Sequence, residues 1–317
     1  MSLIKIGVVG VGSMGVNHCK VLQKIKNVQF VGVFDINQER NEQVANMFAV
    51  TAFSSYEELM NGADAVIIAA PTFHHFSLIV QAIQKGKHVL VEKPLVTSLK
   101  EAEHIITMVE KESVIVQVGH IERFNPVFKQ LSYMMKMENV ISLEARRFGV
   151  PYRHIDTDVI LDLMIHDIDI ILQLVKSPLS NVTGVGYYGK DGQLEGAAAL
   201  LSFQNGCFAS LLSSRLSLEK KRSLYVTEKN RFLKANLLAK ELYIYHEITK
   251  PLTSIRSYHP ENIIEKVAIP HAEALYLEIE HFVQSIQTKH SPKVGVHEAA
   301  KVLEVALRIK EQIEKNK

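Results

Sequence analysis

Ile4-Lys-Ile-Gly-Val-Val-Gly10-Val-Gly12-Ser13-Met14-Gly15 is the stretch that decides the fold of this chain. An apolar run leads into a G-x-G-x-x-G motif, and a helical pattern over residues 16–25 follows, which is the context that a dinucleotide-binding motif requires. Gly10 would allow the tight turn, Gly12 the close approach of a pyrophosphate, and Gly15 close packing of helix on strand. The alternative is a structural turn without a nucleotide. The predicted cofactor-binding residues here are Gly10, Gly12, Ser13, Met14 and Gly15.

Asp35 lies 20 residues after Gly15, at the end of the second apolar run. A carboxylate at this position can accept hydrogen bonds from the adenosine ribose hydroxyls and would repel a 2′-phosphate, which favours NAD over NADP. Arg40, in the next helical pattern, would soften this preference. We therefore predict NAD as the cofactor, with NADP less favoured.

The first 120 residues alternate between short apolar runs and amphipathic helical patterns. Continuous apolar strands separated by such helices predict a parallel sheet covered on both faces, an α/β Rossmann domain over residues 1–120. The predicted strands are Ile4–Val9, Gln29–Phe34, Ala65–Ala69, His88–Val91 and Val114–Val118. The predicted helices include Gln38–Met47, Tyr56–Met60, His75–Lys85 and Leu99–Lys111.

Beyond His120 the pattern changes, and residues 121–317 are predicted to form a second domain. Glu138–Phe148 alternates like a strand, residues 158–175 are strongly helical, and residues 182–267 are mostly strand-like with turn signals such as Asn205-Gly206. This predicts an α+β C-terminal domain with a large, mostly antiparallel open sheet. Two helices are expected at Ala272–Thr288 and His297–Lys315.

The composition excludes several classes of protein. With 47% hydrophobic and 22% charged residues among 317, and a net charge of +2, the chain is typical of a globular protein and carries no nucleic-acid signature. The apolar run at residues 3–11 is too short for a signal peptide, and no stretch has the length of a membrane span. Cys19 and Cys207 lack metal-ligand spacing and are expected to be buried. We expect no membrane association and a cytoplasmic location.

Glu92-Lys93-Pro94 ends the apolar run at residues 88–91. Ligands collect at the carboxyl ends of strands in an open parallel sheet, and an ammonium there can polarise a substrate hydroxyl. The alternative is a solvated lysine. Pro71-Thr72-Phe-His-His75 ends another strand in the same way, and His74 or His75 either packs along the cofactor or simply begins a helix.

Residues 158–175 carry a polar stripe on an otherwise apolar helix. At about 100° per residue, Asp158, Asp162, His166 and Asp169 fall within an arc of roughly 80°. Asp162 and His166 are i,i+4 neighbours, and a histidine beside a carboxylate is suited to general-base catalysis. A structural hydrogen-bond network is one alternative. A metal site of Asp162, His166 and Asp169 is another, but no further ligands accompany them, so we predict no metal.

These motifs together resemble the glucose–fructose oxidoreductase/inositol dehydrogenase/MocA family. The resemblance rests on Gly10–Gly15, Pro71–His75, Glu92–Pro94, residues 119–126 and Asp162-xxx-His166-xx-Asp169, in family order. It implies a Rossmann domain, an open-sheet C-terminal domain that commonly builds a homodimer or homotetramer, and metal-free oxidation of an alcohol by NAD. It casts Lys93, Asp162 and His166 as the catalytic residues.

Residues 118–126, with Ala145-Arg146-Arg147, resemble the branch that oxidises the 3-hydroxyl of UDP-N-acetylglucosamine. Arg123, Arg146, Arg147 and Arg153 would then meet the diphosphate of a nucleotide sugar. The alternatives are a free polyol or inositol dehydrogenase, an enzyme that cleaves glycosides through transient oxidation by NAD, and a non-catalytic NAD-binding sensor. The segment from Tyr152 to Asp158 has no recognised pattern. The further predicted cofactor-binding residues are Asp35, Arg40, Pro71, Thr72, His75, Glu92 and Lys93, and the predicted substrate-binding residues are Glu122, Arg123, Asn125, Arg147, Arg153 and Asp169.

Overall fold

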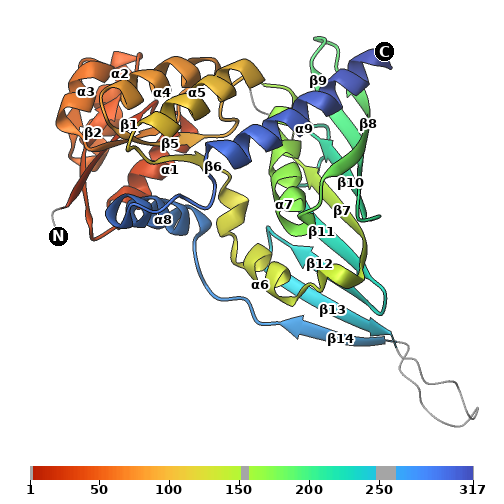
Figure 1. The fold of residues 1–317 in the computed structure, drawn as a ribbon. Coiled ribbons are helices and arrows are strands. Elements are labelled where there is room, and N and C mark those ends of the chain that lie inside the picture. Colours follow the sequence, from red (N-terminus) through yellow and green to blue (C-terminus); the bar gives the residue numbers. More distant parts are fainter. Residues whose placement is uncertain (1–2, 151–156, 248–261, 317) are drawn as a thin grey trace, which may run out of the picture. The chain divides into compact units, whose positions relative to one another are not determined.

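The computed structural model describes residues 3–150, 157–247 and 262–316, which divide into two compact units (Figure 1). The first unit comprises residues 1–124 and 273–304, and the second comprises residues 125–272 and 305–317. A single boundary near residue 120 was predicted, whereas the chain leaves the first unit and later returns to it. Each unit is described by itself.

A six-stranded parallel sheet with the strand order β3-β2-β1-β4-β5-β6 forms the centre of the first unit. Its strands are β1 (Ile4–Val9), β2 (Val28–Phe34), β3 (Thr51–Ala52), β4 (Ala65–Ile68), β5 (His88–Glu92) and β6 (Val116–Gly119). The short β3 was not predicted, since two exposed residues carry no hydrophobic pattern. Otherwise the Rossmann prediction is confirmed.

Helices cover this sheet on both faces, with α4 and α5 on one side and α1 and α8 on the other (Figure 1). The helical segments are α1 (Ser13–Leu22), α2 (Gln38–Phe48), α3 (Tyr56–Gly62), η1 (Thr72–His74), α4 (His75–Gln84), α5 (Leu99–Lys111), η2 (Ile121–Phe124) and α8 (Ala274–Thr288). Ser98 and Glu101 form a capping box at the start of α5, which fixes where that helix begins. The described helices are all too short or too polar to cross a membrane.

Helix α8 belongs to the first unit although it is distant in sequence. Its residues Leu275, Ile279, Phe282 and Val283 are buried in one cluster with side chains of β1 and α1. Gln117 on β6 also donates a hydrogen bond from Nε2 to the Glu278 carbonyl oxygen, at 3.1 Å. The amphipathic pattern of α8 predicted a helix but did not specify its partner. The division between the units falls within α9 (Val296–Lys315).

The second unit contains an eight-stranded sheet with the order β14-β13-β12-β11-β7-β10-β9-β8. Among the described strands of this sheet, only β7 and β10 pair in parallel, so the prediction of a mostly antiparallel sheet is confirmed. The strands are β7 (Val140–Phe148), β8 (Leu179–Tyr188), β9 (Leu194–Phe203), β10 (Phe208–Ser214), β11 (Lys221–Glu228), β12 (Arg231–Asn236), β13 (Glu241–Glu247) and β14 (Asn262–Val267). Asn205-Gly206 forms the predicted hairpin turn between β9 and β10, with Gly206 at φ +84°.

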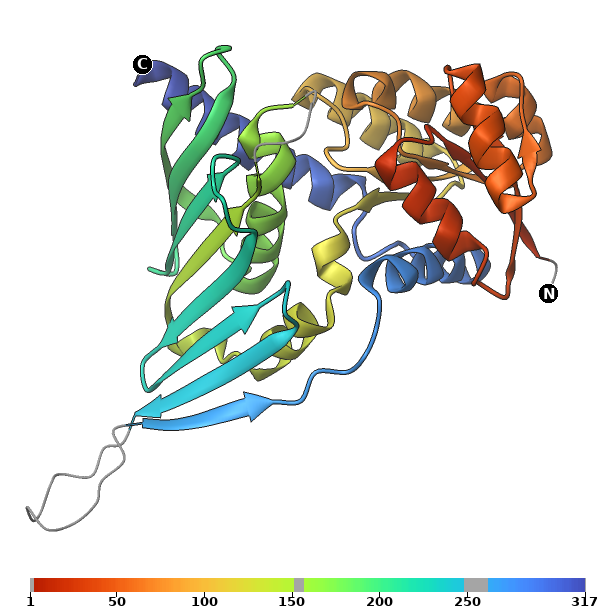
Figure 2. The ribbon, with the colours of Figure 1, turned by 180° about the vertical axis from the view of Figure 1, so that it is seen from behind.

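One face of this sheet is covered by helices (Figure 2). The helical segments of the second unit are α6 (Pro126–Met134), η3 (Met137–Asn139), η4 (Ile160–Met164), α7 (Ile165–Val175) and the end of α9. Leu143, Ala145 and Arg147 on β7 are buried, whereas the residues between them are only partly so. This period-2 alternation is what a sheet with one covered face requires.

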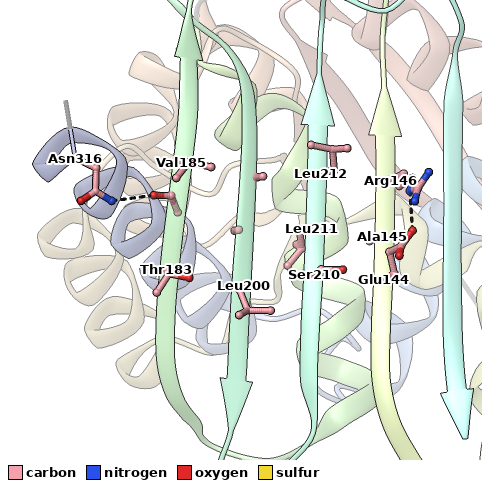
Figure 3. Close-up of a pocket in the computed structure, with 13 residues that line it drawn as sticks. Glu144, Ala145, Arg146, Thr183, Val185, Leu200, Ser210, Leu211, Leu212 and Asn316 are labelled. Atoms are coloured by element: carbon pink, nitrogen blue, oxygen red, sulfur yellow. Dashed lines mark hydrogen bonds and ion pairs between the residues drawn. The ribbon is translucent and has the colours of Figure 1, made fainter.

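The other face of the sheet is open and carries apolar side chains (Figure 3). Val185, Leu200 and Leu212 point outward from three adjacent strands and are 61%, 43% and 41% exposed. They line a shallow hollow of about 440 Å³ together with Arg146, whose Nε lies 2.6 Å from the Glu144 carboxylate. We refer to this outward surface of β8, β9, β10 and β7 as the open face.

Candidate active site

The glycine motif forms the turn between β1 and α1. Gly10 has φ +82°, and a Cβ there would lie 2.6 Å from the backbone nitrogen of Ala70. A Cβ on Gly15 would lie 1.9 Å from the Gly10 carbonyl oxygen, so both positions require glycine. These two contacts agree with the roles predicted from the spacing.

Gly12 is different, because a Cβ at this position would meet no atom within 4 Å. Gly12 is the N-cap of α1, supplies no side-chain hydrogen bond, and is followed by a first turn without acidic residues. Gly12, Ser13 and Met14 are all exposed. The open space in front of unsatisfied helix N–H groups fits the pyrophosphate of a dinucleotide.

Asp35 follows β2 and lies beside the glycine turn. Its Oδ2 accepts a hydrogen bond from the Val11 N–H at 2.7 Å, and its Oδ1 accepts one from the Asn37 N–H at 2.9 Å. Arg40 donates from Nε to the Val11 carbonyl oxygen at 3.1 Å, so its guanidinium also lies against this turn. A carboxylate has further acceptor capacity beyond these two bonds, which suits ribose hydroxyls.

The segments Pro71–His75 and Glu92–Pro94 meet where β4 and β5 end. Thr72 is buried and Pro71 is exposed. His75 is 1% exposed, and its Nδ1 and Nε2 lie 2.9 Å from the carbonyl oxygens of Pro94 and Ala70. Burial is the largest influence on the imidazole and lowers the pKa of His75 despite these carbonyls. His75 therefore joins the two segments, and its predicted role in cofactor binding stays a prediction.

Lys93 follows β5 directly and is partly exposed, at the carboxyl end of the strand as predicted. The peptide bond between Lys93 and Pro94 is cis. The preceding Glu92 is largely buried, and its Oε1 lies 2.7 Å from Nε2 of His18 on α1. Burial would raise the pKa of Glu92, but the His18 hydrogen bond and the neighbouring charges of His18, Lys93 and His75 lower it overall.

His18 was not predicted, although it lies one helical turn after Gly15. Because His18 and Glu92 are far apart in the sequence, no local pattern indicated that they pair. Glu92 contacts α1 through this pair, and its predicted role in cofactor binding stays a prediction. The pair connects the glycine motif to the lysine motif within the first unit.

Residues 120–126 connect the two units in sequence. Glu122 and Arg123, on η2, are 3% and 8% exposed. Asn125 caps α6 by accepting a hydrogen bond from the Val127 N–H and donates from Nδ2 to the Leu237 carbonyl oxygen. Their predicted role in substrate binding stays a prediction.

Asp162 and His166 lie in the helical segment η4–α7 of the second unit. One turn of this segment, η4, is a π-helix rather than the regular α-helix that was predicted. Such wide turns occur often at functional sites. Between residues 159 and 171 only Asp162, Leu163 and His166 are partly exposed, and all other residues are buried. The structure therefore presents the predicted catalytic acid and histidine together at the accessible part of this helix.

The other acids of the stripe are engaged elsewhere. Asp158 accepts hydrogen bonds at Oδ1 from the N–H groups of Ile160 and Leu161, and its Oδ2 lies 3.0 Å from Lys310 Nζ. Asp158 thus caps the segment. Asp169 is fully buried. The structure shows no cluster of three or more potential metal ligands in residues 3–150, 157–247 and 262–316.

Arg147 forms a buried ion pair with Asp167, with Nε and Nη2 both within 3.1 Å of the carboxylate. The two side chains are 2% and 4% exposed. A buried guanidinium paired in this way stabilises the packing of α7 on β7. Because this ion pair already engages the guanidinium, Arg147 is not among the proposed substrate contacts. Arg153 and most of the Tyr152–Asp158 segment lie outside the described residues.

The sequence matches two family models. Residues 4–120 match the oxidoreductase family GFO/IDH/MocA, described as having an NAD-binding Rossmann fold, and residues 145–231 match the GFO/IDH/MocA C-terminal domain. The UDP-N-acetylglucosamine 3-dehydrogenase of Acidithiobacillus ferrooxidans is 32% identical and covers 98% of this chain and 97% of its own. A solved structure of that enzyme has a TM-score of 0.90 over 99% of both chains.

Two further proteins show how widely the similarity extends. The scyllo-inositol 2-dehydrogenase (NAD(+)) of Bacillus subtilis is 27% identical over 96% of this chain and 92% of its own. The structure of GenD2 from gentamicin A biosynthesis, in complex with NAD, is 18% identical with a TM-score of 0.85 over 100% of this chain and 96% of that chain, and shares the fold. Together with the glycine turn and Asp35, these matches show that the chain belongs to the GFO/IDH/MocA family and is an NAD-dependent dehydrogenase acting on CH–OH groups.

Proposed function

We propose that this enzyme oxidises a secondary alcohol of a sugar, specifically the 3-hydroxyl of a UDP-N-acetylhexosamine. The observation that carries the proposal is the 32% identity, over almost the whole of both chains, to a UDP-N-acetylglucosamine 3-dehydrogenase. Arg123 and Arg153 are the proposed contacts to the diphosphate, with Glu122, Asn125 and Asp169 as further substrate-binding residues.

Lys93, Asp162 and His166 form the proposed catalytic trio. His166 takes the hydroxyl proton, the Lys93 ammonium stabilises the developing alkoxide, and Asp162 orients and tunes the histidine. The nicotinamide ring supplies the hydride acceptor when NAD is bound. The products are a ketone, NADH and a proton.

Single substitutions test the trio. Lys93→Ala and His166→Ala should each lower turnover at least about 100-fold, because general acid–base and electrostatic catalysis contribute that much. NAD should still bind, which fluorescence titration measures. Matched controls are Lys111→Ala and His290→Ala, at exposed positions. Near-wild-type rates in both trio variants would exclude the assignment.

A substrate panel tests the proposed sugar. NADH absorbance is followed with NAD and UDP-N-acetylglucosamine, its uronic acid, free glucose or inositol. A signal confined to the UDP-sugars supports the proposal. The similarity to an inositol dehydrogenase favours a polyol as the second candidate, and a signal with inositol alone would keep the trio and replace the substrate.

A non-catalytic NAD sensor would give no NADH with any substrate. An enzyme that cleaves glycosides through transient oxidation would release product without net NADH. Both outcomes would exclude the proposed reaction.

We also propose that the open face joins copies of this chain into a homodimer or homotetramer. Contiguous apolar patches on a sheet surface usually mark an interface. Val185, Leu200, Phe208 and Leu212 provide such a patch, each at least 41% exposed.

A further inference from the structure

Arg215 is a buried arginine that the sequence motifs do not include. It directly follows β10 and is 8% exposed. Its backbone N–H donates to the Glu195 carbonyl oxygen on β9 at 2.9 Å. The main chain at this position is therefore held by the sheet, and the side chain extends from a fixed base.

The Arg215 guanidinium reaches three acceptors in different parts of the second unit. Nη2 donates to the Thr157 carbonyl oxygen at 2.5 Å and lies 3.3 Å from Oδ2 of Asp162, while Nη1 lies 3.9 Å from Oε1 of Glu195. The carboxylates of Asp162 and Glu195 are only 17% and 19% exposed. A buried guanidinium requires such counter-charges, and its planar set of donors fixes the direction of each partner.

The backbone around Asp162 explains why the contact with Arg215 matters for the direction of its carboxylate. Asp162 lies in the π-turn η4, where the helix departs from regular geometry, and Thr157 lies in a bend just before this helical segment. Arg215 contacts both Thr157, before this turn, and Asp162, within it. In a π-turn, regular helical spacing does not fix the direction of the Asp162 carboxylate. The contact with Arg215, which is anchored on the sheet, can fix it instead.

We propose that Arg215 is a positioning residue that holds the Asp162 carboxylate in its working orientation beside His166. This inference rests on the proposed function of Asp162 and His166. Arg215 acts through Asp162 and takes no part in proton or hydride transfer itself. The Glu195 carboxylate lies on the Nη1 side of the guanidinium and balances its charge.

The test compares Arg215→Ala with a matched variant, Arg231→Ala. Arg231 also donates to a main-chain carbonyl, that of Met134, and pairs with a buried carboxylate, Glu228, but contacts none of the proposed catalytic residues. Thermal unfolding of both variants measures the general cost of losing an arginine that is mostly shielded from solvent and paired with carboxylate and carbonyl oxygens.

Steady-state kinetics on the best substrate of the panel provide the functional readout. Arg215→Ala should lower kcat roughly 10- to 100-fold while the KM for NAD stays unchanged, because an orienting contact contributes less than the general base itself. Guanidinium ion added at millimolar concentration should restore part of kcat, and Arg215→Lys should retain an intermediate rate. Arg231→Ala should keep the kcat of the wild type, without any response to guanidinium.

Hydrogen exchange of the proteins without substrate gives a readout independent of turnover. Amides of residues 160–166 should exchange faster in Arg215→Ala than in Arg231→Ala or the wild type. A wild-type kcat in Arg215→Ala, or equal exchange in all three proteins, would overturn the proposal. A wild type that is inactive on every substrate would overturn the proposed function instead, and the exchange result would still decide whether Arg215 holds this turn.

Discussion

Nε2 of His18 lies 2.7 Å from Oε1 of Glu92, which joins the helix of the glycine motif to the strand that ends at Lys93. A second carboxyl, that of Glu278 on α8, is fully buried within the same unit, and neither of its oxygens has a hydrogen-bond partner in the part of the chain that the structure describes. Burial and the nearby charge of Glu92 raise the pKa of Glu278 well above its ordinary value. Glu92 is therefore the charged member of the pair and Glu278 the neutral one.

This arrangement predicts that the Glu278→Gln variant becomes increasingly more stable than the wild type as the pH rises. A raised carboxyl pKa stabilises the folded state fully below the unfolded pKa, about 4.3, and this contribution is lost as the pH rises towards the folded pKa. As the pH rises above the unfolded pKa, the free energy of unfolding of the variant should gain on that of the wild type by up to about 1.4 kcal/mol per pH unit. Urea unfolding at several pH values measures it. Glu280→Gln, on the exposed side of α8, should show no such trend, and a constant difference for Glu278→Gln would contradict the assignment.

The geometry of the glycine turn predicts that two alanine substitutions act differently, one on NAD binding and the other on stability. Gly12→Ala should weaken NAD binding, because its methyl group enters the open space before α1, yet change the free energy of unfolding by no more than about 0.5 kcal/mol. Gly15→Ala should destabilise the apoprotein by about 3 kcal/mol, because its methyl group collides with the Gly10 carbonyl. Fluorescence titration with NAD and urea unfolding separate the two effects. Equal losses of stability would argue against the cofactor role of Gly12.

Asp35 predicts the cofactor preference. Asp35→Ser should raise the KM for NAD about 10- to 100-fold, because hydrogen bonds to a charged group are lost, and should allow measurable turnover with NADP. Initial rates with both cofactors test this. Glu39→Gln, an exposed acid in the first turn of α2, is the control and should leave the ratio of NAD to NADP activity unchanged. An unaltered preference in Asp35→Ser would show that another residue selects the cofactor.

If the open face joins copies of this chain, a charged residue placed on it should separate them. The Leu212→Asp variant should form smaller species than the wild type, because an aspartate on an apolar interface loses its hydration without gaining a partner. Light scattering coupled to size-exclusion chromatography measures the mass. Leu218→Asp, at a leucine that is 94% exposed in the loop after β10, should leave the assembly intact. A monomeric wild type would exclude the proposed interface.

Local patterns in the sequence predicted the elements of both sheets well. Apolar runs and the glycine motif specified the Rossmann strands, and Asn205-Gly206 specified a hairpin, because each signal depends on neighbouring residues. The π-turn at Asp162 was not predicted, since apolar periodicity shows a helix but not a local change in its width. The partner of α8 was missed for a similar reason.

Contacts between distant residues were the main omission in the candidate site. His18 and Glu92 are far apart in the sequence, and Arg215 stands alone after a strand, so neither contact leaves a local pattern. Arg147 carried the opposite problem, because its charge suggested a phosphate ligand whereas the structure shows a buried ion pair with Asp167. A single sequence indicates which residue types are present but not which charges neutralise one another.

The return of α8 to the first unit has a consequence for how the protein is made. A ribosome completes the glycine motif, Asp35 and Lys93 within the first third of synthesis, but Leu275, Ile279 and Phe282 emerge only near the end. Until then the face of the sheet that they cover has exposed apolar surface. The nascent NAD-binding unit must therefore wait for the whole second sheet to be translated before its core can close, and a fragment that ends at residue 124 should aggregate where the full chain folds.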